Sequence, residues 1–210
     1  MKKIFSAGIG IFVLLLSVAV CAQSQYFIDI NECTQQELID ELYEMNLVEG
    51  LPGGTFEPDR KVTRAEFCEM MYRISDFSEK TENISFPDVN ENEWYFKSVS
   101  ALSNAGIVNG FEDGLFHPDE CITNEQAIKI AVEIFEYNCE IIYSNTAATY
   151  FTDYTQIADW AKGYIHKACD IGCIISSDED VCVLKPKGNT TRAKSAELMF
   201  YLYNSIDAWN

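Results

Sequence analysis

Residues 86–126 read FPDVNENEWYFKSVSALSNAGIVNGFEDGLFHPDECITNEQ. This stretch holds a Phe-x-Asp start, a run with helical spacing, a loop with a proline, and a threonine five residues after that proline. Two other stretches repeat the same order, with starts at Phe27 and Phe151 and threonines at Thr63 and Thr191. A period of about 60 residues indicates a repeat architecture, in which neighbouring units share one core. We therefore expect three repeats, at residues 27–77, 86–137 and 150–206.

Each repeat is predicted to contain two helices joined by a short extended arm. In the second repeat, residues 94–105 carry apolar side chains at helical spacing, and the apolar pair at 107–108 suits an extended arm. Thr123 and Gln126 then form a capping box, in which a hydroxyl and an amide satisfy backbone N–H groups at a helix start. Two short helices cannot bury their apolar faces alone, so the repeats must share a helical core.

The order of these features resembles the S-layer homology module. The second repeat carries nearly all of that signature, in Phe86-Pro87-Asp88-Val89, Trp94, Gly106-Ile107-Val108-Asn109-Gly110 and Asp113-Gly114-Leu115-Phe116-His117-Pro118. The resemblance extends from Phe27 to Ile206. It implies a mainly α fold, with three repeats in a pseudo-threefold arrangement around a shared helical core. It also implies that grooves between repeats bind an acidic secondary polysaccharide of the bacterial cell wall.

Residues 1–22 have the pattern of a secretory signal peptide, with two lysines followed by an uncharged apolar run from 4 to 20. We expect cleavage after Ala22, export to the cell wall and cell surface, and no stable membrane insertion afterwards. The apolar run is near the lower length limit of a membrane span, so an uncleaved anchor is an alternative. A lipoprotein acylated at Cys21 is another, although Val20 stands where a small residue is usual.

The chain is strongly acidic, with 15 basic and 33 acidic residues and a formal net charge of −18. Loss of the signal peptide removes two lysines and no acid, which leaves 13 basic residues and a net charge of −20. Such a surface repels nucleic acid and anionic membranes, so neither is expected as a partner. A site for an anion must then be a local cluster of cations.

Arg64 and Arg192 are the first candidates for a ligand site. Each follows an N-cap threonine, where the helix N-terminus is already positive, so capping does not explain an arginine there. A planar guanidinium suits a carboxylate or a pyruvate ketal on a sugar, and the resemblance implies the same role. The alternative is an ordinary salt bridge to one of the many acids. Asn124 holds the matching place in the second repeat and cannot supply the charge.

Tryptophan and aspartate side chains complete the candidate glycan site. Trp94 and Trp160 begin the first helices of their repeats, where an indole can stack on a sugar ring, and a place in the core or at its rim is the alternative. The aspartate of each Phe-x-Asp start can accept sugar hydroxyls or can cap the chain before a helix. These aspartates are Asp29, Asp88 and Asp153.

The resemblance implies that each groove joins the arginine of one repeat to the aspartate and tryptophan of the next. The groove of Arg64 with Asp88 and Trp94 would then be complete. The other two grooves would each lack a part, because one has Asn124 for the cation and one has Thr34 in place of the indole. We therefore expect one good groove rather than three.

Seven cysteines follow the expected cleavage site, so at least one thiol stays free in a monomer. Cys68 lies on the apolar face of a helix and is expected to be a small core residue. A local disulfide between Cys173 and Cys182 is one alternative for these two thiols. Together with Cys169 and His166 they also suggest zinc, but the spacing matches no standard structural zinc site.

No catalytic constellation emerges from the sequence. Neither histidine has a serine or cysteine at a spacing that suggests a triad, and carboxylate pairs are uninformative in so acidic a chain. The run Asp88-x-Asn90-x-Asn92 starts like a calcium loop but lacks its glycine and closing glutamate. We expect no enzyme activity, cofactor or metal. The expected function is a secreted wall-binding module for an anionic polysaccharide, and the alternative is a degenerate module that binds another envelope protein.

Overall fold

The computed structural model describes residues 24–75, 77, 86–140, 151–174 and 182–209. The expected signal peptide lies outside these residues. Six α-helices occupy the described part, together with the short 3-10 helix η2 (Tyr154–Gln156). The helices are α1 (Gln36–Glu44), α2 (Arg64–Tyr72), α3 (Phe96–Asn104), α4 (Asn124–Asn138), α5 (Asp159–Asp170) and α6 (Arg192–Trp209). The only β-structure in these ranges is a set of isolated bridges, so the expected mainly α fold class is confirmed.

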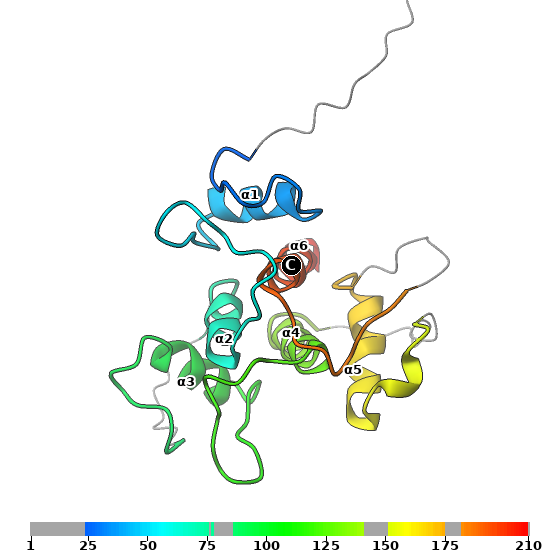
Figure 1. The fold of residues 1–210 in the computed structure, drawn as a ribbon. Helices are drawn as coiled ribbons and strands as arrows, with labels where there is room; N and C mark the ends of the chain where they lie inside the picture. The colour runs from blue at the N-terminus through cyan, green and yellow to red at the C-terminus, as the bar shows by residue number, and fades with distance from the viewer. Residues whose placement is uncertain (1–23, 76, 78–85, 141–150, 175–181, 210) are drawn as a thin grey trace, which may run out of the picture.

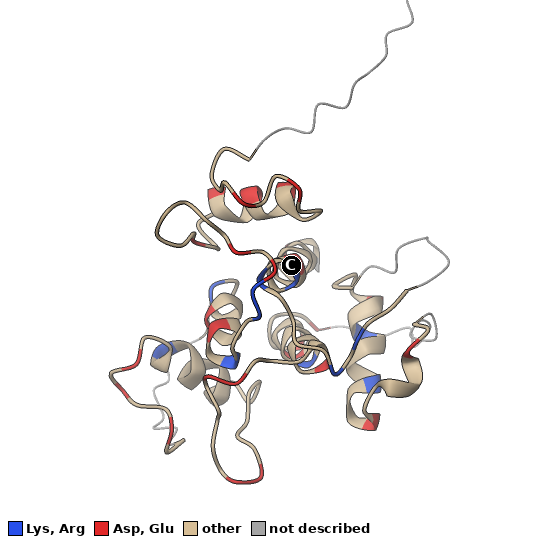
Figure 2. Ribbon diagram, viewed as in Figure 1, with Lys and Arg blue, Asp and Glu red and all other residues tan. Residues whose placement is uncertain are grey.

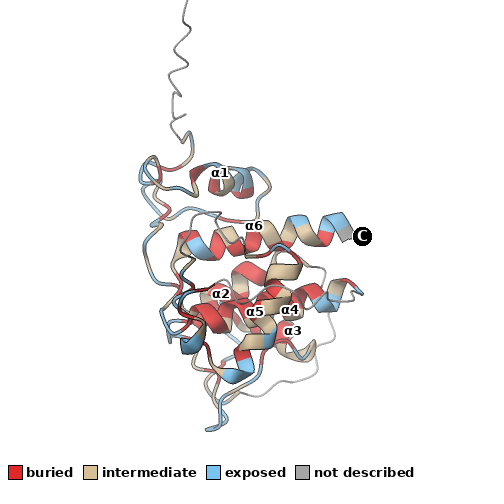
Figure 3. Ribbon diagram, turned by 90° about the vertical axis from the view of Figure 1, so that its right-hand side faces the viewer, coloured by how far each residue is buried: buried red, intermediate tan, exposed pale blue. Residues whose placement is uncertain are grey.

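Three of the helices form the centre and three lie outside them. The second helices of the repeats, α2, α4 and α6, pack on one another (Figure 1). Each first helix packs on a central helix from a different repeat, namely α1 on α6, α3 on α2 and α5 on α4. Figure 3 shows that buried residues are concentrated in this stack of helices. No helix in the described ranges is both long enough and apolar enough to cross a membrane.

The predicted threonine N-caps are confirmed. The Thr63 and Thr123 hydroxyls accept the backbone N–H groups of Glu66 and Gln126, whose side chains accept the threonine N–H in return. In the third repeat the Thr191 hydroxyl accepts the backbone N–H three residues later, at 3.3 Å. The repeat pattern therefore identified the start of every central helix.

The loop of each repeat also caps a helix of another repeat. The first backbone N–H of α2 donates to Glu120 O at 2.8 Å, that of α4 to Gly188 O at 2.9 Å, and that of α6 to Arg60 O at 2.8 Å. Three further backbone hydrogen bonds at the centre also connect each repeat to the next in a closed cycle. They run from Val62 N to Thr190 O, from Thr190 N to Ile122 O, and from Ile122 N to Val62 O. Donors that a helix start leaves unpaired are thus satisfied by a different repeat. The pseudo-threefold arrangement as a whole stays a prediction.

Gly110 stands where the arm of the second repeat passes the start of that repeat. A Cβ at this position would lie 2.9 Å from the Phe86 ring and 3.0 Å from Leu115 O. We therefore expect Gly110→Ala to lower the free energy of unfolding by about 1–3 kcal/mol, as overpacking does. Chemical denaturation measures this change.

Gly163 in α5 provides the matched control, because a Cβ there meets no atom within 4 Å. Gly163→Ala should raise stability by about 0.5–1 kcal/mol, since alanine favours a helix. Equal effects of the two variants would contradict the close approach at Gly110.

Candidate functional site

Two grooves in the structure each combine an arginine with a tryptophan, and all three repeats contribute to each of them. The Arg64 groove is lined by Arg64, residues 107–111, Gln126, Lys129, Ile130 and Trp160, and has a volume of about 220 Å³. The Arg192 groove is lined by Arg192, residues 47–51, Glu66, Glu69, Met70, Arg73 and Trp94, and has a volume of about 210 Å³. In both, the floor is the arm and central helix of one repeat, and the other two repeats supply the arginine and the indole.

Arg64 is the first residue of α2 and is only 8% exposed. Its guanidinium donates to Asn109 O at 2.7 Å and lies over the Phe116 ring at 4.6 Å and the Phe111 ring at 4.9 Å. Its Nε is buried without a partner, and no described carboxylate forms a salt bridge with it. Burial lowers the pKa of this guanidinium from its ordinary value, but arginine stays charged in proteins. The salt bridge considered as an alternative is therefore absent from the described residues.

Lys129 and Trp160 complete the Arg64 groove. Lys129 Nζ donates to Ile107 O at 3.3 Å and pairs with Glu133 on the same helix. Trp160 lies at the start of α5 and is 49% exposed, so it is a surface residue and not part of the core. The lining thus contains two cations, one indole face and no carboxylate.

Arg192 has a similar environment at the start of α6. Its guanidinium donates to Glu49 O at 2.6 Å and lies over the Phe56 ring at 4.7 Å. Its Nε is also buried without a partner, and burial lowers its pKa. Trp94, in the same groove, is 60% exposed. Both tryptophan side chains are therefore accessible to solvent.

The structure corrects the expected pairing of arginine and tryptophan. Arg64 shares a groove with Trp160 rather than Trp94, and Arg192 shares a groove with Trp94 rather than with Thr34. The reason is that a groove spans three repeats. Each groove takes its arginine, its arm and its tryptophan from three different repeats, so an arginine does not share a groove with the tryptophan of the next repeat. Two grooves, and not one, therefore contain both a cation and an indole.

The three aspartates line neither groove. Each carboxylate accepts two backbone N–H groups from a turn about 30 residues later in the chain. These pairs are Asp29 with Phe56 and Glu57, Asp88 with Phe116 and His117, and Asp153 with Leu184 and Lys185. The second residue of each pair has φ between 52° and 58°, a conformation that is uncommon for residues with a side chain. The aspartates therefore hold strained turns in place, a role that neither sequence-based alternative anticipated.

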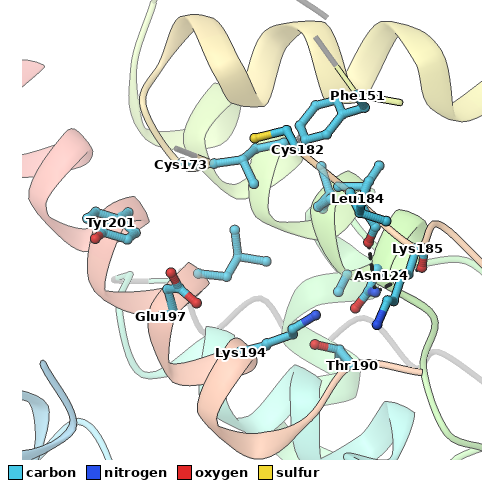
Figure 4. Close-up of a pocket in the computed structure, with 15 residues that line it drawn as sticks. Asn124, Phe151, Cys173, Cys182, Leu184, Lys185, Thr190, Lys194, Glu197 and Tyr201 are labelled. Atoms are coloured by element: carbon cyan, nitrogen blue, oxygen red, sulfur yellow. Dashed lines mark hydrogen bonds between the residues drawn. The ribbon is translucent and has the colours of Figure 1, made fainter. Parts of the chain in front are cut away.

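The third groove has a different lining (Figure 4). Asn124 takes the place of the arginine, and its side-chain amide donates to Leu184 O at 3.1 Å and Lys185 O at 2.9 Å. Leu184 is equivalent to Phe116 and Phe56, the rings over which Arg64 and Arg192 lie. Among the described side chains, no tryptophan lines this cavity of about 500 Å³. The missing guanidinium was expected from the sequence, but the missing indole was not, because Trp160 lines the Arg64 groove instead.

Sequence reasoning missed Lys129 and the backbone carbonyl of Asn109. Lys129 lies one turn after the capping-box residue Gln126, on the same face of the helix, and this spacing could have identified it. Nothing in the sequence indicates that Asn109 O accepts a hydrogen bond from Arg64.

Six of the described cysteines are free thiols, namely Cys33, Cys68, Cys121, Cys139, Cys169 and Cys173. Cys68 is fully buried in the core, as expected, and burial raises its pKa to about 12. Burial also raises the pKa of Cys173 to about 12 and that of Cys169 to about 11. A nucleophilic cysteine requires a lowered pKa, so none of these three is activated.

Comparison with known proteins gives a family match for part of the chain. Residues 27–68 and 85–128 match the S-layer homology domain, and the third repeat lies outside the matched segments. An amylopullulanase of Thermoanaerobacterium thermosulfurigenes is 34% identical over 84% of this chain, and the exoglucanase XynX of Acetivibrio thermocellus is 34% identical over 87%. A surface-layer 125 kDa protein of Lysinibacillus sphaericus is 25% identical over 99%. The aligned regions span only 9%, 17% and 17% of these relatives.

Proposed function

We propose that this chain is a non-catalytic module that attaches to the bacterial cell wall by binding an anionic secondary polysaccharide. The S-layer homology match and the surface-layer relative support the anchoring role. Two enzymes with different names share this segment as a small part of their length. A segment common to different activities fits attachment better than catalysis.

One observation carries the proposal, namely the chemistry of the Arg64 groove. A guanidinium without a carboxylate partner, a second cation and an exposed indole line one small cavity. The guanidinium can form paired hydrogen bonds with a carboxylate or ketal, and the indole of Trp160 can stack on the apolar face of the sugar. This combination suits an acidic sugar unit.

The charge of the rest of the surface explains why such a site must be local. Figure 2 shows acidic residues along α1 and the outer loops, and the net charge of the whole chain is −18. An anionic polymer is repelled by this surface and is attracted only where cations outnumber acids. The lining of the Arg64 groove meets that condition.

The alternative partner is another envelope protein, and it draws support from the third groove. Asn124 and the absent tryptophan remove the ligand-binding groups there while leaving an open cavity. Whether the partner is a polysaccharide or an envelope protein, we propose that the chain is exported and resides at the cell surface.

Binding to purified wall sacculi tests the proposed function. We expect the protein to sediment with sacculi, and to lose that binding after acid extraction of the accessory polysaccharide. Raising the salt concentration from about 0.1 M to 0.5 M should weaken binding several-fold, because salt screens charge attraction. Binding that survives both extraction and salt would instead support the envelope-protein alternative, with a wall-bound protein as the partner.

A further inference from the structure

Glu125 is a buried acid at a position where the other two repeats have alanine. It is the second residue of α4, is 4% exposed, and corresponds to Ala65 and Ala193. One carboxylate oxygen accepts the backbone N–H of Ala158 at 3.1 Å, and the other pairs with the Lys187 ammonium group. A carboxylate is costly to bury unless it is paired. This one is paired with two groups of the third repeat.

The N–H that Glu125 accepts lies at the start of α5. Ala158 is the N-cap of this helix and has no side chain that could satisfy a backbone donor there. The Glu125 carboxylate accepts the donor instead, and a negative charge at a helix N-terminus is stabilising. This contact coincides with an early helix start, because α5 begins one residue before Trp160 whereas α3 begins two residues after the equivalent Trp94. Trp160 therefore lies in the first turn of a helix, and Trp94 lies in a turn that precedes one.

The helix that carries Glu125 also forms the floor of the Arg64 groove. Gln126, Lys129 and Ile130 of α4 line this groove, and Trp160 is the lining residue that the third repeat contributes. Hydrogen bonds from Tyr164 to Glu133 and from Lys167 to Glu136 join α4 and α5 one and two turns beyond Trp160. The bond between Glu125 and Ala158 joins the two helices at the end where Trp160 lies.

We infer that Glu125 is a positioning residue for ligand binding, which fixes the start of α5 and thereby holds Trp160 in the Arg64 groove. This inference rests on the proposed function, because it requires Trp160 to contact the ligand. Glu125 itself does not line the groove. Its effect on affinity therefore passes through Trp160.

Nuclear magnetic resonance of the indole N–H groups tests the positioning without a ligand. Trp160→Ala identifies the Trp160 resonance by its loss. Glu125→Ala should shift or broaden that resonance and leave the Trp94 resonance unchanged, and the fold accepts alanine at this place in the other two repeats. Glu125→Gln should keep the Trp160 resonance close to that of the parent, since the amide oxygen can still accept the Ala158 N–H. A Trp160 resonance that is identical in Glu125→Ala and the parent overturns the inference.

Binding to purified wall sacculi tests the effect on affinity. Glu125→Ala should weaken binding by about fivefold, the size expected for loss of an aromatic contact. Glu125→Gln should stay within about twofold of the parent, because it keeps the hydrogen bond. Both variants remove the same charge, so the difference between them reports the hydrogen-bond acceptor and not the acidity of the surface.

A double-mutant cycle shows whether the effect passes through Trp160. In a Trp160→Ala background, Glu125→Ala should cause no further loss of binding, whereas in a Trp94→Ala background it should still cause a loss of about fivefold. Equal losses in the two backgrounds overturn the inference and leave the proposed function standing. Failure of the parent to bind sacculi contradicts the proposed function, and the indole resonances then still decide whether Glu125 positions Trp160.

Discussion

Replacement of Arg64 by asparagine will weaken binding to purified wall sacculi by about tenfold or more. The substitution removes the positive charge that an acidic sugar would contact, and a hydrogen bond to a charged group contributes roughly 1.5–3 kcal/mol. Sedimentation with increasing amounts of sacculi gives the apparent affinity. The expected loss is the largest for any single substitution in the two arginine grooves.

The chain itself supplies a reason to choose asparagine. Asn124 occupies the equivalent position in the second repeat and is 8% exposed. Its side-chain amide donates two hydrogen bonds, to the backbone carbonyls of Leu184 and Lys185. The fold therefore accepts asparagine at this place. Arg192→Asn should cost less, because carboxylates already offset the cations of its groove. An Arg64→Asn protein with the parent's circular dichroism and the parent's affinity would contradict the Arg64 groove as the anion site.

Replacement of Asp153 by alanine will lower the free energy of unfolding by on the order of 3 kcal/mol. The carboxylate is 7% exposed and accepts the N–H groups of Leu184 and Lys185 at 3.0 and 2.7 Å. Each buried donor left without an acceptor costs about 1–3 kcal/mol. The turn also loses the contacts that hold Lys185 at a φ of 52°. Denaturant unfolding measures the change.

Asp119 offers a control of the same residue type, because it is exposed and no hydrogen bond or salt bridge of its side chain is present in the described structure. Asp119→Ala should change stability by no more than about 0.5 kcal/mol. A similar small effect of Asp153→Ala would show that the turn does not depend on this carboxylate.

The sequence predicted local structure better than it predicted the grooves. Thr63 and Thr123 were identified as helix caps because a cap is made by residues three apart in the chain. The partner of Trp94 could not be found in the same way. Aligning repeats shows which residues are equivalent, but it does not show that Trp94 shares a groove with Arg192.

The role of the aspartates could not be predicted from the sequence, for a related reason. Asp88 is bound to the backbone of residues 116–117, and backbone N–H groups leave no trace in the residue types that a sequence pattern compares. The sequence did not predict the positive φ of His117 either, because glycine is the residue that usually indicates such a turn. Asp88 was therefore predicted to contact a ligand, whereas its carboxylate accepts hydrogen bonds from the backbone of the same chain.

The cycle in which each loop caps the helix of another repeat has a consequence for how this protein can evolve. Residues 62, 122 and 190 bond to one another in a closed circuit, so removal of any one repeat leaves the other two with unpaired donors and acceptors. A helix start that lacks the arginine is therefore still needed, because its backbone completes the circuit. Selection can then relax on the side chains that face the grooves while it still preserves the backbone circuit. In the second repeat, Asn124 stands where the other two repeats have an arginine, while the capping box is intact and Lys129 still lines the Arg64 groove.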